Sequence, residues 1–419
     1  MSPGPLAIFP WGEVIEAFLD PLGLTAADFA ERMRGGWLFG YVSALARQQR
    51  GSVIVYASER VERPTRLTHA ETGAPIWLVP GRRSGGGLTR RWPSVGAVQQ
   101  WRRTPFFAFA DVVRREGCTA ILAQDYEHPR FDALVALARV LRMPVYATFQ
   151  GGDITLSPLE RTVRRRSLRT CQGLIVASRR ERLRLAQDYG VPAERVADTP
   201  NPVDVAAWTA EPRQAARAAL GLGPDEFVVL NHGRIDIWRK GLDVMVEAWR
   251  CVAAKAPDAR LVVLGSGQDR EAFAALVANL PSLRWLDHYV TDPRVVRRWL
   301  SAADAYLTLS RVEGMPVAPL EAMACGLPLV ASDAHGLADI LQEGEAAGGW
   351  LVPREDAGAA AIAILALRHR PELRARLGAA ARATVERRYG LEPVGRALAA
   401  ALAGPAAVVA APSPARSRA

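Results

Sequence analysis

The sequence predicts an α/β protein whose parallel sheets are covered by helices on both faces. Along the whole chain, short runs rich in β-branched residues alternate with longer Ala-, Leu- and Arg-rich segments of helical period. Strands that alternate with helices in this way are typical of doubly wound sheets. The chain has 419 residues, which exceeds what one hydrophobic core usually serves, so its length favours two domains.

Eleven strands are expected, each a short apolar run next to turn residues. In the first half they are Leu6–Phe9, Val53–Tyr56, Ala120–Ala123, Pro144–Thr148 and Leu174–Val176. In the second half they are Phe227–Asn231, Arg260–Leu264, Leu283–Leu286, Ala305–Leu309, Pro328–Ser332 and Gly349–Val352. Helices are expected to fill the intervals between these strands.

The segment Asn201-Pro202-Val203-Asp204 interrupts the alternating pattern, and we expect a domain boundary there. Pro202 fixes its own φ and holds the preceding residue extended, which suits a linker. The expected units are a first Rossmann-like domain, residues 1–203, and a second Rossmann-like domain, residues 204–388. A helix over residues 389–403 should pack back on the first domain. Residues 404–419 lack the apolar pattern needed to pack, so they should form a disordered tail.

Net charge is +10, and most of the excess lies in residues 1–205, which hold 28 Arg against 20 Asp and Glu. A basic nucleic-acid-binding protein is therefore one alternative. It is disfavoured because the arginines are scattered and lack a docking motif or an aromatic platform. The basic run Arg161–Arg169 is the best candidate for contact with an anionic membrane surface, and a solvated helix face is the alternative.

The cysteines and the terminal segments indicate the compartment. Four cysteines without paired spacing argue against a disulfide framework or a zinc site and for a reducing compartment. The N-terminus shows no secretory signal, and the longest uncharged run, residues 397–412, is too short to span a bilayer. We expect a soluble, cytoplasmic protein, with association at the inner face of the membrane as a further option.

Two cations follow the strand Phe227–Asn231, and they are candidates for binding phosphate. Arg234 comes after the turn His232-Gly233, and Lys240, one of only two lysines in the chain, precedes an amphipathic helix. In an open α/β sheet, ligands bind past the carboxyl ends of strands. Fixed cations at that edge would offset the charge of a diphosphate leaving group. Considered alone, the segment also fits a solvated surface cluster.

A second segment, Glu313-Gly314-Met315-Pro316-Val317-Ala318-Pro319-Leu320-Glu321, carries two carboxylates. Proline is favoured in the first helical turn, so we expect a helix to begin near Pro319, with Glu321 in its first turn and Glu313 on the preceding loop. The start of that helix would attract an anion. The alternative is that Glu321 only complements the helix dipole while Glu313 is solvated. Combined with the two cations, the segment indicates a nucleotide-sugar site, since carboxylates suit the hydroxyls of ribose and hexose.

At these residues the chain resembles the retaining glycosyltransferases of family 4, also called glycosyl transferase group 1. These enzymes have the GT-B fold, in which two Rossmann-like, doubly wound domains face each other across a cleft. The matching segments are His232–Arg234 through Lys240-Gly241, Glu313 to Glu321 with Ala322–Pro328, Ala177-Ser178, and Asn201–Asp204, where the family usually has Asn-Gly-Val-Asp.

The resemblance implies roles for these residues. Arg234 and Lys240, beside Gly233, would bind the donor diphosphate, and Glu321 would hold the ribose. Glu313 and the backbone after it would handle the transferred sugar; that backbone comprises Gly314, Met315, Pro316 and Val317. The implied reaction moves a hexose from a UDP- or GDP-sugar to an acceptor hydroxyl of a glycan, glycolipid or metabolite, with retention and without metal or cofactor.

The first half fits the family less closely. The Gly-rich loop of the family normally follows the first strand directly. In this chain Gly35-Gly36 comes about twenty-five residues after Phe9 and opens the expected helix Trp37–Arg47. These glycines are candidates for meeting phosphate or acceptor, and a plain helix start is the alternative. His128 lies where relatives often place an active-site histidine. Gln150, Gly151 and Asp153 follow a strand where many relatives carry His-Gly, and they are candidates for a polar contact to substrate.

A close enzymatic alternative is a nucleotide-sugar epimerase built on the same two-domain plan. An epimerase turns over its nucleotide sugar without an acceptor, and a transferase does not. The residues of the motifs do not distinguish between the two.

Overall fold

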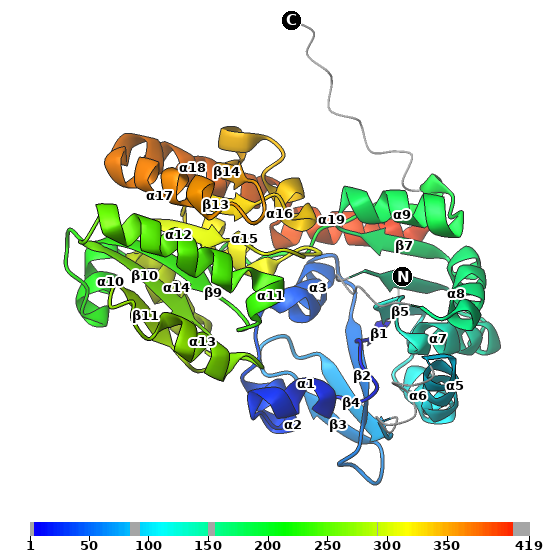
Figure 1. Ribbon diagram of the computed structural model, residues 1–419. Coiled ribbons are helices and arrows are strands. Elements are labelled where there is room, and N and C mark those ends of the chain that lie inside the picture. The colour runs from blue at the N-terminus through cyan, green and yellow to red at the C-terminus, as the bar shows by residue number, and fades with distance from the viewer. Residues whose placement is uncertain (1–3, 84–92, 150–155, 291, 405–419) are drawn as a thin grey trace, which may run out of the picture.

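The computed structural model describes residues 4–83, 93–149, 156–290 and 292–404, which form two α/β domains side by side (Figure 1). The first domain contains an eight-stranded sheet and the second a six-stranded sheet, and every strand pair but one is parallel. Among the described residues, no helix is long and apolar enough to cross a membrane.

The first sheet has the strand order β3-β4-β2-β1-β5-β6-β7-β8. Its strands are β1 Leu6–Phe9, β2 Ser52–Ser58, β3 Thr65–Thr68, β4 Pro75–Pro80, β5 Ala120–Gln124, β6 Val145–Thr148, β7 Gly173–Val176 and β8 Val196–Asp198. Alternate residues of β1 face opposite cores. Ala7 and Phe9 belong to the apolar core on one face of the sheet, whereas Leu6 and Ile8 belong to the core on the other face.

The helices of this domain cover both faces of the sheet. They are α1 Glu16–Leu19, α2 Ala26–Glu31, α3 Gly36–Arg47, α5 Pro93–Arg103, α6 Phe106–Arg115, α7 Pro129–Leu141, α8 Pro158–Thr170 and α9 Arg179–Tyr189. The expected helix at Trp37–Arg47 is confirmed as α3. Gly35, its N-cap, and Gly36, its first residue, have positive φ values of 63° and 61°. Glycine takes this backbone conformation without the steric cost that other residues carry.

The second sheet has the order β11-β10-β9-β12-β13-β14. Its strands are β9 Phe227–His232, β10 Ala259–Leu264, β11 Leu283–Leu286, β12 Ala305–Thr308, β13 Leu329–Ser332 and β14 Gly349–Val352. Its helices are α10 Arg213–Leu220, α11 Ile237–Lys240, α12 Leu242–Lys255, α13 Arg270–Val277, α14 Pro293–Ala302, α15 Val317–Ala324, α16 His335–Ile340, α17 Ala357–His369 and α18 Pro371–Arg388. One apolar core lies on each face of the sheet.

All eleven expected strands are present within one or two residues, and three further strands were missed. The strand β3 lies at the edge of the sheet, and its side chains are alternately exposed, so it lacks the apolar run of a central strand. The next strand, β4, begins and ends with proline, which reads as a turn signal. The last, β8, has only three residues, also at an edge.

The C-terminal helix α19, Leu391–Ala403, returns to the first domain and packs along α3. Its residues Leu391, Val394 and Leu398 join the core beneath β1. An added Cβ on Gly395 would clash with the carbonyl oxygen of Ala44 in α3, so the two helices are in close backbone contact. The expected tail beyond Gly404 lies outside the described residues.

The chain crosses between the domains twice, and the two crossings lie next to each other. The first is the linker around Asn201–Asp204, and the second leads from α18 to α19. The Val203 N–H donates to the carbonyl oxygen of Tyr389 at 2.7 Å, and Val203 forms a parallel β-bridge with Gly390.

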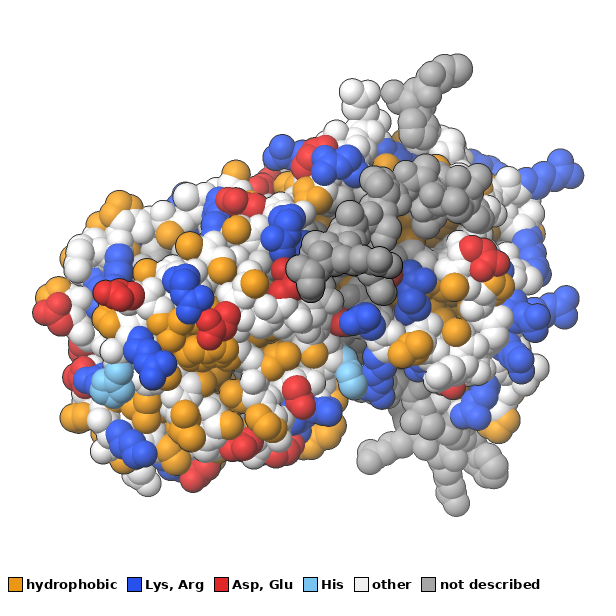
Figure 2. Space-filling model, turned by 90° about the horizontal axis from the view of Figure 1, so that it is seen from above, with side chains coloured by type: hydrophobic (Ala, Val, Ile, Leu, Met, Phe, Trp, Pro, Cys, Tyr) orange, Lys and Arg blue, Asp and Glu red, His pale blue; other side chains and the backbone are white. Residues whose placement is uncertain are grey.

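The basic run Arg161–Arg169 belongs to α8, and it is only partly a surface patch. Arg161, Arg165, Arg166 and Arg169 are exposed, but Arg164 is completely buried and pairs with Asp132 of α7. In Figure 2, Lys and Arg side chains are spread along the side of the molecule that carries α8 and α9. Contact with an anionic surface stays a prediction for the four exposed arginines.

Replacing Asp132 with alanine is expected to lower the free energy of unfolding by about 3 kcal/mol, because it leaves the buried Arg164 charge uncompensated. The guanidinium donates to both carboxylate oxygens, at 3.1 and 3.0 Å. Urea denaturation measures the change. As a control, Asp111→Ala removes an exposed pair with Arg115 and should cost about 0–1 kcal/mol. Equal costs for the two variants would contradict the buried role of Asp132.

Candidate active site

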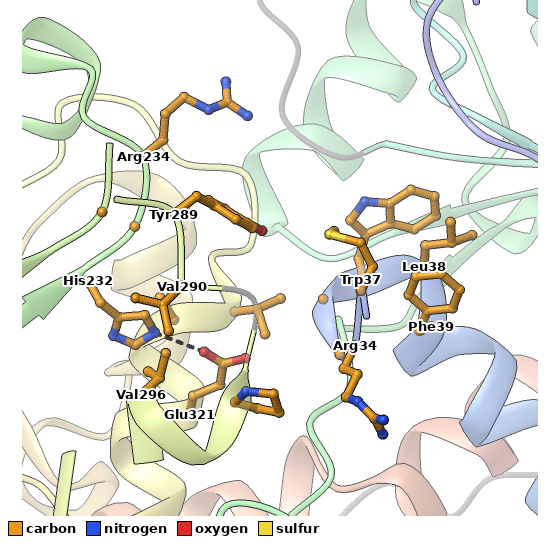
Figure 3. Close-up of a pocket in the computed structure, with 18 of the residues that line it drawn as sticks. Arg34, Trp37, Leu38, Phe39, His232, Arg234, Tyr289, Val290, Val296 and Glu321 are labelled. Atoms are coloured by element: carbon orange, nitrogen blue, oxygen red, sulfur yellow. Dashed lines mark hydrogen bonds and ion pairs between the residues drawn. The ribbon is translucent and has the colours of Figure 1, made fainter. Parts of the chain in front are cut away.

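A cavity of about 380 Å³ lies between the two domains, at the carboxyl ends of several strands (Figure 3). The second domain contributes residues that follow β9, β10 and β11, together with the start of α15. The first domain contributes Trp11 after β1 and the segment that opens α3. Two of the expected site segments, Gly233-Arg234 and Gly35-Gly36, therefore line one cavity. Carboxyl ends of parallel strands are where open α/β sheets bind their ligands.

Arg234 stands on the second domain's side of this cavity, in the loop between β9 and α11. Its side chain is exposed, and the ion pairs formed within the described part of the chain do not include it. Two backbone hydrogen bonds fix the loop: Gly233 N–H donates to Leu264 O at 2.9 Å, and Ile235 N–H donates to Ser266 O at 3.1 Å. The loop is thus fixed beside the cavity, and among the described residues no carboxylate forms an ion pair with the Arg234 guanidinium.

Glu321 lines the same cavity and is anchored by His232. The distance from His232 Nε2 to Glu321 Oε2 is 2.9 Å, and both side chains are about nine-tenths buried. The other ring nitrogen, Nδ1, is buried without a hydrogen-bond partner among the described residues. The second carboxylate oxygen, Oε1, points toward Gly35, where an added Cβ would lie 3.9 Å away. One oxygen is fixed, and the other faces the cavity.

The start of α15 also reaches the cavity, although not where the sequence placed it. The helix begins at Val317 with Pro316 as its N-cap, so Pro319 is its third residue and Glu321 lies beyond the first turn. The helix therefore begins two residues before the expected start near Pro319, and the expected place of Glu321 in its first turn was wrong. Proline is still tolerated at the third position because the N–H groups of the first turn have no partner within the helix. Val317 and Ala318 line the cavity and bring the positive end of the helix dipole to it.

Lys240 and Glu313 form an ion pair beside the cavity and are not among its described lining residues. Lys240 Nζ lies 2.6 Å from Glu313 Oε1, which also accepts from Ser310 Oγ at 2.7 Å. Gly241, with φ of 58°, lets the turn after Lys240 sit directly on the end of β12, where a Cβ would clash with Leu309 O. The structure therefore brings the expected cation and carboxylate together, although their side chains lie outside the cavity wall.

Loop residues Gly314, Met315 and Pro316 connect this ion pair to α15. The Asn201 side-chain amide of the linker donates to Met315 O at 2.9 Å, and an added Cβ on Gly336 would clash with Gly314 O. The loop is therefore held from two sides. Along the chain, Glu313 precedes the start of α15, and Glu321 lies within the helix.

Tyr289 forms the outer part of the second domain's wall. Burial, followed by the charge of Glu321, raises the pKa of its hydroxyl, and Arg234 acts in the opposite direction. Both charged groups therefore lie close enough to act on one ring. Figure 3 shows Tyr289 between Arg234 and Glu321, pointing across the cavity toward Trp37.

His128 is placed at the start of α7 and does not belong to the described lining of the cavity. Burial, with the charges of Arg130 and Arg164, lowers its pKa to about 4, so its imidazole is neutral at pH 7. Its ring centroid is 6.4 Å from that of Trp11, which does line the cavity. Gln150, Gly151 and Asp153 lie outside the described residues.

Sequence reasoning missed the residues of the first domain's wall. Trp11, Phe18, Met33, Trp37 and Phe39 line the cavity, but as apolar residues at helical spacing they were indistinguishable from core. A usable signal was the segment Met33-Arg34-Gly35-Gly36-Trp37, where large apolar residues flank two glycines at a helix start. His232 was quoted within a motif, and its contact with Glu321 was not foreseen.

Two family models match the chain. Residues 41–207 match the model described as Glycosyltransferase Family 4, and residues 226–370 match the model described as Glycosyl transferases group 1.

Among curated relatives, a D-inositol 3-phosphate glycosyltransferase of Xylanimonas cellulosilytica is 32% identical over 290 residues, which cover 66% of this chain and 67% of the relative. A GDP-mannose-dependent monoacylated alpha-(1-6)-phosphatidylinositol monomannoside mannosyltransferase of Corynebacterium glutamicum is 30% identical over 48% of this chain and 54% of the relative. The chain thus spans about two thirds of the first relative's length and about half of the second's.

Solved structures share the fold at low sequence identity. The Anabaena protein HepE in complex with UDP has a TM-score of 0.71 at 15% identity, covering 95% of this chain and 99% of that one. Sucrose-phosphate synthase from Thermosynechococcus elongatus has a TM-score of 0.71 at 21% identity, covering 94% and 97%. These matches confirm the two-domain GT-B architecture expected from the sequence.

Proposed function

The chain belongs to the glycosyltransferases of group 1 and family 4, and on that premise we propose a retaining hexosyltransferase that uses a UDP- or GDP-sugar. The observation that carries this proposal is the composition of one cavity wall. It combines the exposed cation Arg234, the carboxylate of Glu321 and the start of α15 at the carboxyl ends of the strands. This set matches a nucleoside diphosphate, whose phosphates need cations and N–H donors and whose ribose needs acceptors.

In the proposed reaction, the bond between the anomeric carbon and the diphosphate oxygen breaks, and its electron pair leaves with the diphosphate. The acceptor oxygen then bonds to the same face of the sugar, and its proton passes to the departing phosphate oxygen. Arg234, Lys240 and the start of α15 would stabilise the negative charge that develops there, the part a divalent metal plays in other enzymes. Gly233 allows close approach of the phosphates.

In the ion pair of Lys240 and Glu313, Lys240 is proposed to contact the diphosphate of the donor and Glu313 its sugar. Lys240 ends α11, the short helix that follows the Arg234 loop, and Glu313 precedes the start of α15, so the pair would flank the proposed diphosphate position. Glu313 and the backbone of residues 314–317 would contact the hydroxyls of the sugar. Residues 204–388 would then hold the donor, and residues 1–203, with Gly35 and Gly36 at the cavity, would shape the acceptor side.

The names of the relatives help to decide between sugar transfer and epimerisation. The two curated relatives are named as glycosyltransferases, which favours transfer over the epimerase reaction. One of them is named for GDP-mannose, and the HepE structure contains UDP. The proposal therefore keeps both guanine and uracil nucleotides as donors.

A donor screen tests this proposal. Thermal unfolding with UDP, GDP and dTDP and their sugars should identify one nucleotide diphosphate that stabilises the protein, because a ligand that binds only the folded state raises its stability. Proton NMR with that donor should then show hexose transfer to an acceptor with the anomeric configuration of the donor. Absence of stabilisation by all three nucleotides at millimolar concentration would contradict the proposal, and donor epimerisation without acceptor would favour the alternative.

A further inference from the structure

The first domain's side of the cavity is rich in aromatic residues, whereas the side opposite combines apolar residues with Arg234 and Glu321. We call the first domain's side the aromatic wall; its residues are Trp11, Phe18, Phe29, Met33, Trp37 and Phe39. Trp11 is 39% exposed, and Met33 and Trp37 are half-buried, so these three offer contact area to a bound molecule. Figure 3 shows Trp37 on α3 facing across the cavity toward Tyr289.

The aromatic wall is held in place from behind. Phe29 contacts Phe39 with ring centroids 5.3 Å apart, and Phe39 stacks on His69 at 3.8 Å. His69 Nε2 is hydrogen-bonded to Met33 O at 2.8 Å, which fixes the chain just before α3. Trp37 packs edge-on against Tyr41, with centroids 6.2 Å apart. The segment from Phe29 to Phe39 and the ring of Trp37 are therefore supported by neighbouring side chains before an acceptor arrives, which lowers the entropy cost of binding.

Polar groups that would recognise a polyhydroxylated acceptor are scarce on this side. Among the described lining residues from the first domain, the charged side chain is Arg34, and the remaining polar side chains are the hydroxyl of buried Tyr56 and the indole nitrogens. Arg34 pairs with Glu71 at 3.0 Å, so its charge is already matched. Sugars and inositol phosphates are held by several carboxylates, amides or unpaired cations, and the described part of this wall does not supply them.

Taking the proposed glycosyl transfer as given, we infer that the acceptor is a neutral compound that carries its hydroxyl on an aromatic ring system. Flat rings make offset or edge-on contacts with tryptophan and phenylalanine, and the exposed faces of Trp11 and Trp37 offer these.

Calorimetric binding with three probes tests this inference in the presence of saturating UDP or GDP. The probes are 4-methylumbelliferone, D-inositol 3-phosphate and n-decanol. The aromatic phenol should bind at least about tenfold more tightly than the other two. Trp37→Gln should weaken its binding about tenfold, and Trp37→Phe should retain most of it. Trp350→Gln, which changes a half-buried tryptophan of the second domain outside the cavity lining, is the matched control.

Nucleotide affinity is measured on the same samples and separates the two proposals. Tight binding of UDP or GDP with tighter binding of inositol phosphate or decanol would overturn the inference and leave the proposed transfer standing. Unchanged phenol affinity in the folded Trp37→Gln protein would also overturn it. Failure of every nucleotide to bind would instead contradict the proposed function, whatever the phenol does.

Discussion

Replacing Arg234 with alanine is expected to lower kcat/KM for sugar transfer by about 10²- to 10³-fold, the effect of removing one well-placed electrostatic donor. Arg234 lines the cavity, and its charge is not committed to an ion pair among the described residues. At contact distance such a cation interacts with a phosphate charge by roughly 4 kcal/mol at an effective dielectric constant near 20. Initial rates over a range of donor concentrations measure the loss.

A matched control for this variant is Arg250→Ala, which removes an exposed arginine of α12 that pairs with Glu247 and does not line the cavity. Its rates should stay close to those of the unmodified protein. Adding Lys240→Ala to Arg234→Ala should abolish measurable transfer, because both proposed diphosphate cations are then gone. Turnover retained by the double variant would remove the two residues from the mechanism.

Replacing Glu321 with alanine is expected to weaken nucleoside diphosphate binding by about 10- to 100-fold, as a hydrogen bond to a charged group contributes roughly 1.5–3 kcal/mol. The carboxylate lines the cavity, with Oε2 held by His232 and Oε1 directed inward. The proposed ribose contact needs that second oxygen. Titration calorimetry with UDP and GDP measures the change.

His232→Asn separates the anchor from the carboxylate itself. This variant keeps Glu321 and removes the ring that fixes it at 2.9 Å, so the affinity should fall by less than in Glu321→Ala. Unchanged affinity in folded Glu321→Ala protein would end the ribose assignment. An equal loss in both variants would mean that the imidazole, and not only the carboxylate, meets the nucleotide.

The central strands and the charged motifs could be predicted from sequence because each depends on neighbouring residues. Short strands such as the buried Leu6–Phe9 and the edge strand Leu283–Leu286 have the expected bounds, and Arg234 follows a strand end. Contacts between distant residues could not be predicted in this way. Lys240 and Glu313 are 73 residues apart, and tertiary packing such as that of Gly241 on the end of β12 brings them together.

The aromatic wall escaped prediction for a different reason. The apolar residues of an amphipathic helix have the same spacing whether a core or a cavity covers them, so Trp37 and Phe39 looked like interior residues. The start of α15 was misplaced because proline is acceptable at any of the first helical positions, and the residue type alone does not say which one it occupies.

The paired crossings at Val203 and Tyr389 restrict how the two halves of the protein can move. A single tether would let one half swivel freely over the other. Here two segments of the chain cross between the domains side by side, and the 2.7 Å hydrogen bond from Val203 N–H to Tyr389 O joins them. Because both crossings lie at one place, rotation about that place is the interdomain motion that would disturb the backbone least. Such a rotation would change the gap between Trp37 and Tyr289, which line the cavity from the two domains.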